Sequence, residues 1–123
     1  MRLKSHKELI VFQSAITLAI KIHELSKNFP LEEKYSLTDQ LRRSSRSVAA
    51  NIAEAFRKRR YPKSFVSKLS DSEGEVSETQ VWLYFIESFG YLEPAVTKDL
   101  DDQYEHLLAQ IVTMIQSPEK WSM

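Results

Sequence analysis

The few prolines and glycines of this chain divide it into four long segments, and this division most narrows the folds open to it. The 123 residues include two glycines and four prolines, which leaves little material for the turns and bulges of a β-sheet. Proline disfavours helical backbone in the residue before it, and glycine often follows the end of a helix. The expected breaks lie at Phe29-Pro30, Pro62, Gly90 to Pro94, and Ser117-Pro118.

The spacing of apolar residues predicts one helix in each segment, at about 6–28, 33–59, 62–89 and 94–117. In the second segment the apolar stripe repeats every three or four residues, as one helix face does. This stripe consists of Leu37, Leu41, Ser44, Val48, Ile52 and Ala55. Short connections favour neighbouring helices that run in opposite directions. We therefore expect an all-α fold, an antiparallel up-down-up-down four-helix bundle that forms a single domain over residues 1–123.

The first segment carries two apolar stripes, whereas a bundle core needs only one per helix. One stripe consists of Leu9, Phe12, Ile16, Ala19 and His23. The other consists of Val11, Ala15, Leu18, Ile22 and Leu25. Scattered apolar residues are common on protein surfaces, so a small bundle could simply leave one stripe exposed. Regular spacing over four turns favours an interface instead. We therefore predict a homo-oligomer whose interface is the second stripe.

Charge is strongly polarised along the chain although the total is zero. The 17 Lys and Arg residues balance the 17 Asp and Glu residues. Between positions 42 and 63, however, Glu54 is the single acidic residue among many cations. These cations are Arg42, Arg43, Arg46, Arg57, Lys58, Arg59, Arg60 and Lys63. Between positions 71 and 105, in contrast, Lys98 is the single basic residue. A neutral total therefore does not exclude an anionic partner.

The basic stretch has three interpretations, and charge alone does not separate them. It could be a solvated surface, or a surface that pairs with the acidic third or fourth helix within or between subunits. It could also bind a nucleic-acid backbone, since clustered cations gain affinity by releasing counterions. The helical period places Arg42, Arg43, Arg46 and Arg57 on one outward arc. Small residues share this arc, namely Ala49, Ala50 and Ala53, and they would let a partner approach closely.

Polar residues lie on or beside the apolar stripe of the second predicted helix. They are Ser44, Ser47 and Asn51. Buried polar groups need hydrogen-bond partners, and local bonding to a backbone carbonyl is one solution. The other solution is a polar layer between helices, with Thr79 and Gln80 of the third helix as the partners.

Residues for catalysis are sparse. The three histidines do not form a His-x-x-x-His or Glu-x-x-His pair, so the ligand pattern of di-iron bundles is missing from the sequence. There is no cysteine, and both glycines are isolated, so no glycine-rich phosphate loop is present. We expect no catalytic residue, no metal ligand, no cofactor and no enzymatic activity.

The sequence indicates neither export nor a membrane partner. A basic start precedes an apolar-rich stretch, but Glu8 and Lys21 interrupt this stretch and no cleavage site follows. No run approaches the roughly 18 apolar residues of a membrane span. We expect a cytoplasmic protein that does not bind membranes.

Several segments together resemble one known family. They are residues 8–13 (ELIVFQ), 29–30 (FP), 33–44 (EKYSLTDQLRRS), 47–54 (SVAANIAE), 77–80 (SETQ) and 90–92 (GYL). The chain is similar to the four-helix-bundle family that includes proteins encoded in intervening sequences of bacterial 23S rRNA genes. This family also includes the accessory variability determinant of diversity-generating retroelements. The resemblance spans nearly the whole chain.

The resemblance implies an antiparallel bundle that assembles as a ring-like homopentamer and has no known catalysis. The retroelement relatives present basic surfaces to a reverse transcriptase and to RNA. The resemblance therefore implies that the partner is RNA, DNA or a nucleic-acid enzyme such as a reverse transcriptase. It also implies that the eight basic residues of positions 42–63 bind this partner. Ala55 departs from the family, where glycine is common, and so does the acidic stretch from Asp71. The alternative is a protein–protein scaffold with no nucleic-acid role.

Overall fold

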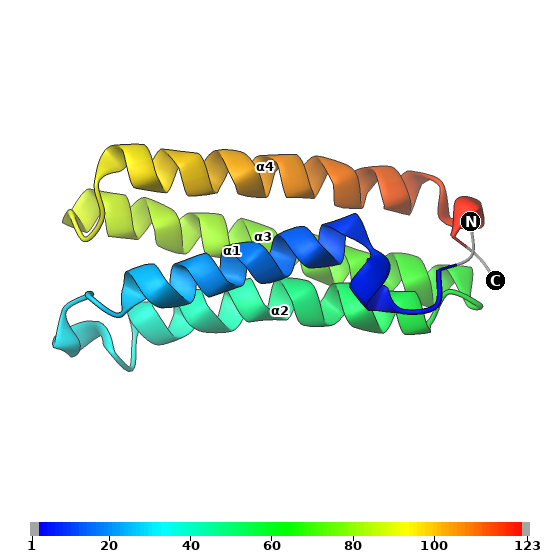
Figure 1. Ribbon diagram of the computed structural model, residues 1–123, viewed down its shortest axis with the longest axis horizontal. Helices are drawn as coiled ribbons and strands as arrows, with labels where there is room; N and C mark the ends of the chain where they lie inside the picture. Colours follow the sequence, from blue (N-terminus) through cyan, green and yellow to red (C-terminus); the bar gives the residue numbers. More distant parts are fainter. Residues whose placement is uncertain (1–2, 122–123) are drawn as a thin grey trace.

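Four long helices make up most of the part of the chain that the structure describes. The computed structural model describes residues 3–121, and this range contains helices and turns but no strand. The helices are α1 (Ile10–Ser26), α2 (Leu37–Arg57), α3 (Pro62–Phe89) and α4 (Pro94–Gln116). Three short 3-10 turns are η1 (His6–Glu8), η2 (Leu31–Glu33) and η3 (Pro118–Lys120). The helices lie side by side, with successive connections at alternate ends (Figure 1). The predicted all-α helical bundle is thus confirmed for the described residues.

Two helices begin later than the sequence pattern suggests, because local hydrogen bonds hold the preceding residues in 3-10 turns. Ser5 caps η1: its Oγ accepts a hydrogen bond from the Lys7 amide at 3.2 Å, and the Glu8 carboxylate accepts from the Ser5 amide at 3.0 Å. α1 therefore begins at Ile10 rather than near His6. Glu33 belongs to η2, where its carboxylate accepts from Ser36 Oγ at 2.7 Å, and α2 begins at Leu37.

Proline and glycine set the later boundaries. Pro62 and Pro94 are the first residues of α3 and α4, where the missing amide hydrogen would have no partner within the helix. Gly90 ends α3 with φ of 74°, a left-handed conformation that strains other residues. The Tyr91 amide then donates to the Ile86 carbonyl at 3.0 Å and closes the last turn.

α2 packs against two neighbouring helices. It packs against both α1 and α3, and α4 packs against α3 and less extensively against α1. α1 therefore lies diagonally across from α3, and α2 lies diagonally across from α4. All six residues of the predicted α2 stripe are buried. Hydrogen bonds and ion pairs join α2 to α3 in reverse order along the two helices: Ser44 to Thr79, Val48 to Ser72, and Glu54 to Lys68.

The predicted polar layer between α2 and α3 is confirmed for Ser44 and Thr79. Their buried hydroxyl oxygens are 2.8 Å apart. Ser72, which sequence reasoning missed, adds a second link by donating to the Val48 carbonyl at 2.9 Å. Asn51 instead bonds locally, to the Ser47 carbonyl at 2.9 Å, and Gln80 reaches Glu105 on α4.

The stripe of α1 predicted to be a subunit interface lies in the core of a single subunit. Four of its members are buried in the core, and Leu25 is half-buried against it. This finding corrects the predicted role of Val11, Ala15, Leu18, Ile22 and Leu25. α1 carries two comparable apolar stripes, and this is the one that is buried where α1 packs on α2 and α4. The large apolar residues that α1 leaves exposed are Ile10, Ile16 and Ile20.

Replacing Leu18 with glutamate is therefore expected to unfold the subunit rather than to separate subunits. Leu18 is 2% exposed, and truncating such a leucine to alanine typically costs about 2–5 kcal/mol. A buried carboxylate costs more, since it loses its hydration without a partner. Thermal unfolding followed by circular dichroism measures the loss. Thr17→Glu is the matched control, because Thr17 is exposed on the same helix and lies outside the exposed apolar residues of α1. Equal melting temperatures for the two variants would contradict the assignment.

The Ser44–Thr79 contact predicts a measurable coupling between α2 and α3. Ser44→Ala and Thr79→Val each remove one buried hydroxyl, and the double variant removes both. We expect a coupling free energy of about 1 kcal/mol in a double-mutant cycle, the usual net value of a protein hydrogen bond. Urea unfolding of the four proteins measures it. Strictly additive effects would show that the contact does not bind the two helices together.

Candidate nucleic-acid interface

The eight predicted binding residues do not form one uniform surface. The structure divides them into three groups by their neighbours. Arg43 is directed toward α3, and Arg42 and Arg46 contact α1. The other five lie at the end of α2, in the turn to α3 and at the start of α3: Arg57, Lys58, Arg59, Arg60 and Lys63.

Arg43 is neutralised within its own subunit. Its Nη1 lies 3.3 Å from Glu75 Oε2, and its Nη2 pairs with Glu78. Partial burial acts to lower the pKa of Arg43, but the charges of Glu75 and Glu78 outweigh it and raise that pKa. For this residue, the interpretation of basic residues pairing with the acidic third helix is confirmed. Arg43 is therefore the least suited of the eight to hold an external phosphate.

Arg42 and Arg46 contact a hydroxyl group and an imidazole ring of α1. Arg42 Nε donates to Ser26 Oγ at 2.8 Å, and Arg46 Nη2 lies 3.2 Å from His23 Nδ1. Neither forms an ion pair with a carboxylate in the part of the chain described. Their positions are fixed while their charges remain uncompensated, which suits contact with an external anion.

Arg42, Arg46 and Arg57 nevertheless share one face of α2. The helical period puts them within about 60° of one another. The exposed Ala50 and half-buried Ala53 lie on the same face, but Ala49 is buried and is not part of it. We call Arg42, Arg46, Ala50 and Arg57 the arginine face.

The cluster at the end of α2 holds the most uncompensated charge. The side chains of Arg57, Lys58, Arg60 and Lys63 are exposed and have no hydrogen-bond or ion-pair partner among residues 3–121. Arg59 is half-buried: its Nε donates to the Phe56 carbonyl at 3.0 Å, and its guanidinium lies 3.6 Å from the Phe56 ring centroid. Cations near a helix C-terminus are favoured by the helix dipole.

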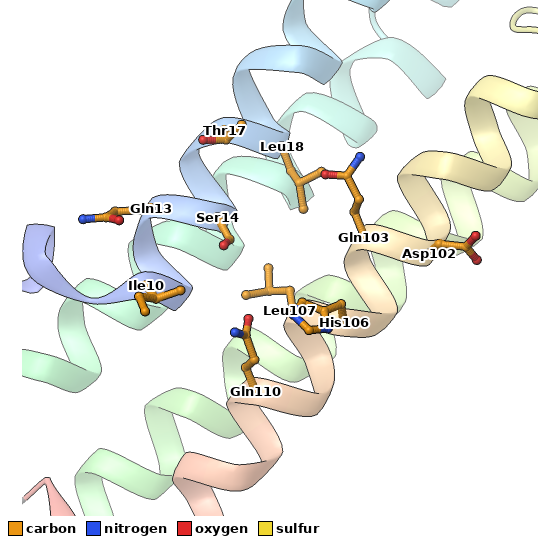
Figure 2. A pocket seen from close by; sticks show the side chains of 10 residues that line it. All are labelled: Ile10, Gln13, Ser14, Thr17, Leu18, Asp102, Gln103, His106, Leu107 and Gln110. Atoms are coloured by element: carbon orange, nitrogen blue, oxygen red, sulfur yellow. The ribbon is translucent and has the colours of Figure 1, made fainter.

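A groove of about 400 Å³ separates parts of α1 and α4. Figure 2 shows Gln13 and Thr17 on one side, and Gln103, His106 and Gln110 on the other. These side chains offer neutral hydrogen-bonding groups and one imidazole. Within the described residues, no three His, Asp or Glu side chains gather as a metal site would require. Sequence reasoning missed the groove because periodicity does not show how far apart two helices lie.

An aromatic patch lies on the outward side of α3. Its exposed members are Val81, Tyr84, Phe85 and Phe89, and Trp82 is half-buried beside them. The ring centroids of Trp82 and Phe85 are 6.2 Å apart, and those of Phe85 and Phe89 are 5.9 Å apart. The patch is local, and no helix within residues 3–121 is long and apolar enough to cross a membrane. We call these five residues the α3 patch.

Comparisons with known proteins agree on the fold. The family model described as 23S rRNA-intervening sequence protein matches residues 7–113, which include all eight basic residues. A crystal structure described as a protein with unknown function from the S23 ribosomal protein family of Bacteroides thetaiotaomicron VPI-5482 is similar, with a TM-score of 0.79 and 24% identity. The similarity covers 87% of this chain and 96% of that one. Among curated proteins none matches.

Proposed function

The chain belongs to the 23S rRNA-intervening sequence protein family, and on that premise we propose that it is a non-enzymatic, homo-oligomeric accessory protein that binds nucleic acid or a nucleoprotein. The binding surface consists of the arginine face together with the cluster at the α2–α3 turn. The observation that carries this proposal is the row of cations on one side of α2 that form no ion pair within residues 3–121.

The length and chemistry of this row suit a phosphate backbone. Arg42 and Arg57 are fifteen positions apart, which is about 22 Å along a helix. This length matches about six successive phosphates on one strand of a duplex. Guanidinium groups donate to phosphate with two parallel hydrogen bonds and keep their charge at any physiological pH. The exposed Ala50 between them leaves room for the backbone.

The acidic residues support the proposal by their position. Asp101 and Glu105 lie on α4, diagonally across from α2, and form no ion pair within residues 3–121. Two further carboxylates of α4, Asp99 and Asp102, are paired with lysines. An approaching polyanion would therefore be attracted to one side of the subunit and repelled from the other. Although the net charge is zero, the separation of positive and negative charges would orient the protein on its partner.

The homo-oligomer requires a different interface from the one predicted. α1 exposes Ile10, Ile16 and Ile20, and the α3 patch lies on the diagonally opposite helix. If α1 of one subunit covers the α3 patch of the next, each contact joins two different surfaces. Such head-to-tail contacts form a ring when the rotation between neighbouring subunits closes, and an open filament when it does not. This geometry supports the ring-like homopentamer of antiparallel up-down-up-down bundles that the family resemblance implies.

The nucleic-acid proposal is tested by the salt dependence of binding. We expect fluorescence anisotropy to show binding to RNA or DNA that is strongest at about 50 mM salt and falls steeply as salt rises. Lys58→Gln should weaken binding several-fold and reduce the salt slope by about 1.

Lys98→Gln is the control for this experiment, because Lys98 is also an exposed lysine but lies on α4, where it pairs with Asp102. It removes the same charge from the opposite side and should leave affinity unchanged. Absence of binding at about 50 mM salt would contradict the proposal, and would favour the protein–protein scaffold. Equal losses in both variants would contradict the location of the surface.

The assembly proposal is tested by measuring mass in solution. Ile20→Glu and Phe85→Glu alter exposed side chains, 59% and 43% accessible respectively, and should give folded monomers from an oligomeric parent. Each variant keeps the surface that the other has lost. A mixture of the two should therefore form one intact contact and stop at a dimer.

Leu31→Glu serves as the control in this experiment, because Leu31 is exposed in η2 and outside both surfaces. It should leave the oligomer intact. A monomeric parent at micromolar concentration would overturn the proposed assembly. A mixture that stays monomeric would overturn the pairing of α1 with the α3 patch.

A further inference from the structure

A cationic pocket lies where the segment before α1 meets the end of α2. Its volume is about 420 Å³, within the range of small-molecule sites. Residues 3–6 form one wall, and Phe56, Arg57, Arg59 and Arg60 form the other. Figure 1 shows the N-terminal segment in dark blue running beside the green end of α2. We call this cavity the terminal pocket.

Among residues 3–121, no carboxylate lines the terminal pocket to balance its positive charge. Lys4, Arg57, Arg59 and Arg60 line the cavity, and none of the described lining residues carries a carboxylate. Glu8 does not line the cavity, although its carboxylate lies against two residues of this wall. Its Oε2 accepts hydrogen bonds from the backbone amides of Lys4 and Ser5, at 2.6 and 3.0 Å. Four neighbouring cations repel one another, so a bound anion would relieve an unfavourable interaction.

Arg59 is held in place before any ligand arrives. Its Nε donates to the Phe56 carbonyl, and its guanidinium stacks on the buried Phe56 ring. Both Nη groups remain without a partner within residues 3–121. A stacked guanidinium keeps its outer edge free for bidentate donation to phosphate. Fixing the side chain in advance lowers the entropy lost on binding.

Ser5 adds a neutral donor to the terminal pocket. Its Oγ accepts a hydrogen bond from the Lys7 amide at 3.2 Å. A serine hydroxyl carries one hydrogen as well as its acceptor sites, so Ser5 can still donate. The pocket therefore combines permanent cations with a hydroxyl, which are the groups that recognise phosphate oxygens.

We propose that the terminal pocket binds a terminal phosphate, the dianionic monoester at the end of a nucleic-acid strand or on a free nucleotide. The inference rests on the proposed function, because Arg57 belongs to both the arginine face and this pocket. A terminal phosphate carries about −1.5 to −2 charges at neutral pH, whereas each phosphate within a strand carries one. Four cations around a concave site therefore suit the higher charge of an end group better than they suit the single charges of a strand that passes over the surface.

The experiment compares two RNA oligonucleotides of one sequence, with either a 5′-phosphate or a 5′-hydroxyl, by fluorescence anisotropy at about 100 mM salt. We expect the 5′-phosphate to bind about tenfold tighter, the effect of one charge-assisted hydrogen bond. Arg59→Gln and Arg60→Gln should abolish this preference. Lys63→Gln is the matched control, because Lys63 lies at the same turn but does not line the pocket. This variant should weaken the binding of both oligonucleotides equally and preserve the ratio of their affinities.

Competition with a nucleoside 5′-monophosphate and with inorganic phosphate distinguishes the two sources of the phosphate. If the nucleotide competes with an affinity equal to that of the oligonucleotide, the ligand is a free nucleotide. If the nucleotide competes much more weakly, the ligand is the end of a strand. Equal binding of the two oligonucleotides would overturn the terminal pocket but leave the proposed function standing. If neither oligonucleotide binds but the nucleotide does, and Arg59→Gln abolishes that binding, the proposed function fails and the pocket stands. If nothing binds, both are overturned.

Discussion

The packing of α2 between two neighbours is the constraint on which the other features depend. A helix with one neighbour buries a narrow stripe, but α2 buries residues against both α1 and α3. Ala49 and Ser45 are therefore buried, and a narrow outward arc remains on which Arg42, Arg46 and Arg57 lie. The Ser44–Thr79 and Ser72–Val48 hydrogen bonds cross this packed interface. They fix how far α2 slides along α3, and so they also fix which arginine meets which carboxylate.

The distribution of charge follows from this arrangement. Arg43 lies on the α3 flank of α2 and meets Glu75 and Glu78, so its charge is compensated within the subunit. Exposed pairs of this kind contribute little to stability, since water and salt screen them. The acidic residues of α4 do not meet α2, because α4 lies across the diagonal. The basic and acidic stretches that are separate in the sequence therefore lie on opposite sides of the molecule.

Much of the fold could be predicted from the sequence, because its signals are local. Proline at 62 and 94, glycine at 90 and an apolar repeat of three and four residues each act within one or two turns. The choice between the two stripes of α1 is not local, since both are apolar and only packing decides between them. The candidate site could likewise be predicted only where its signals are local. The cations near positions 57–63 were visible in the sequence, whereas the pairing of Arg43 and the contact of residues 3–6 with α2 depend on the tertiary arrangement.

The shallow contact of α1 with α4 has a consequence for the motion of the subunit. α1 packs extensively only on α2, and the groove lined by Gln103 and Gln110 lies on its other side. Segments with fewer packed neighbours open locally at a lower free-energy cost. The backbone amides of α1 should therefore exchange with solvent before those of α2 and α3. A neighbouring molecule that covers Ile16 and Ile20 would suppress this opening, so assembly and the order of α1 are thermodynamically linked.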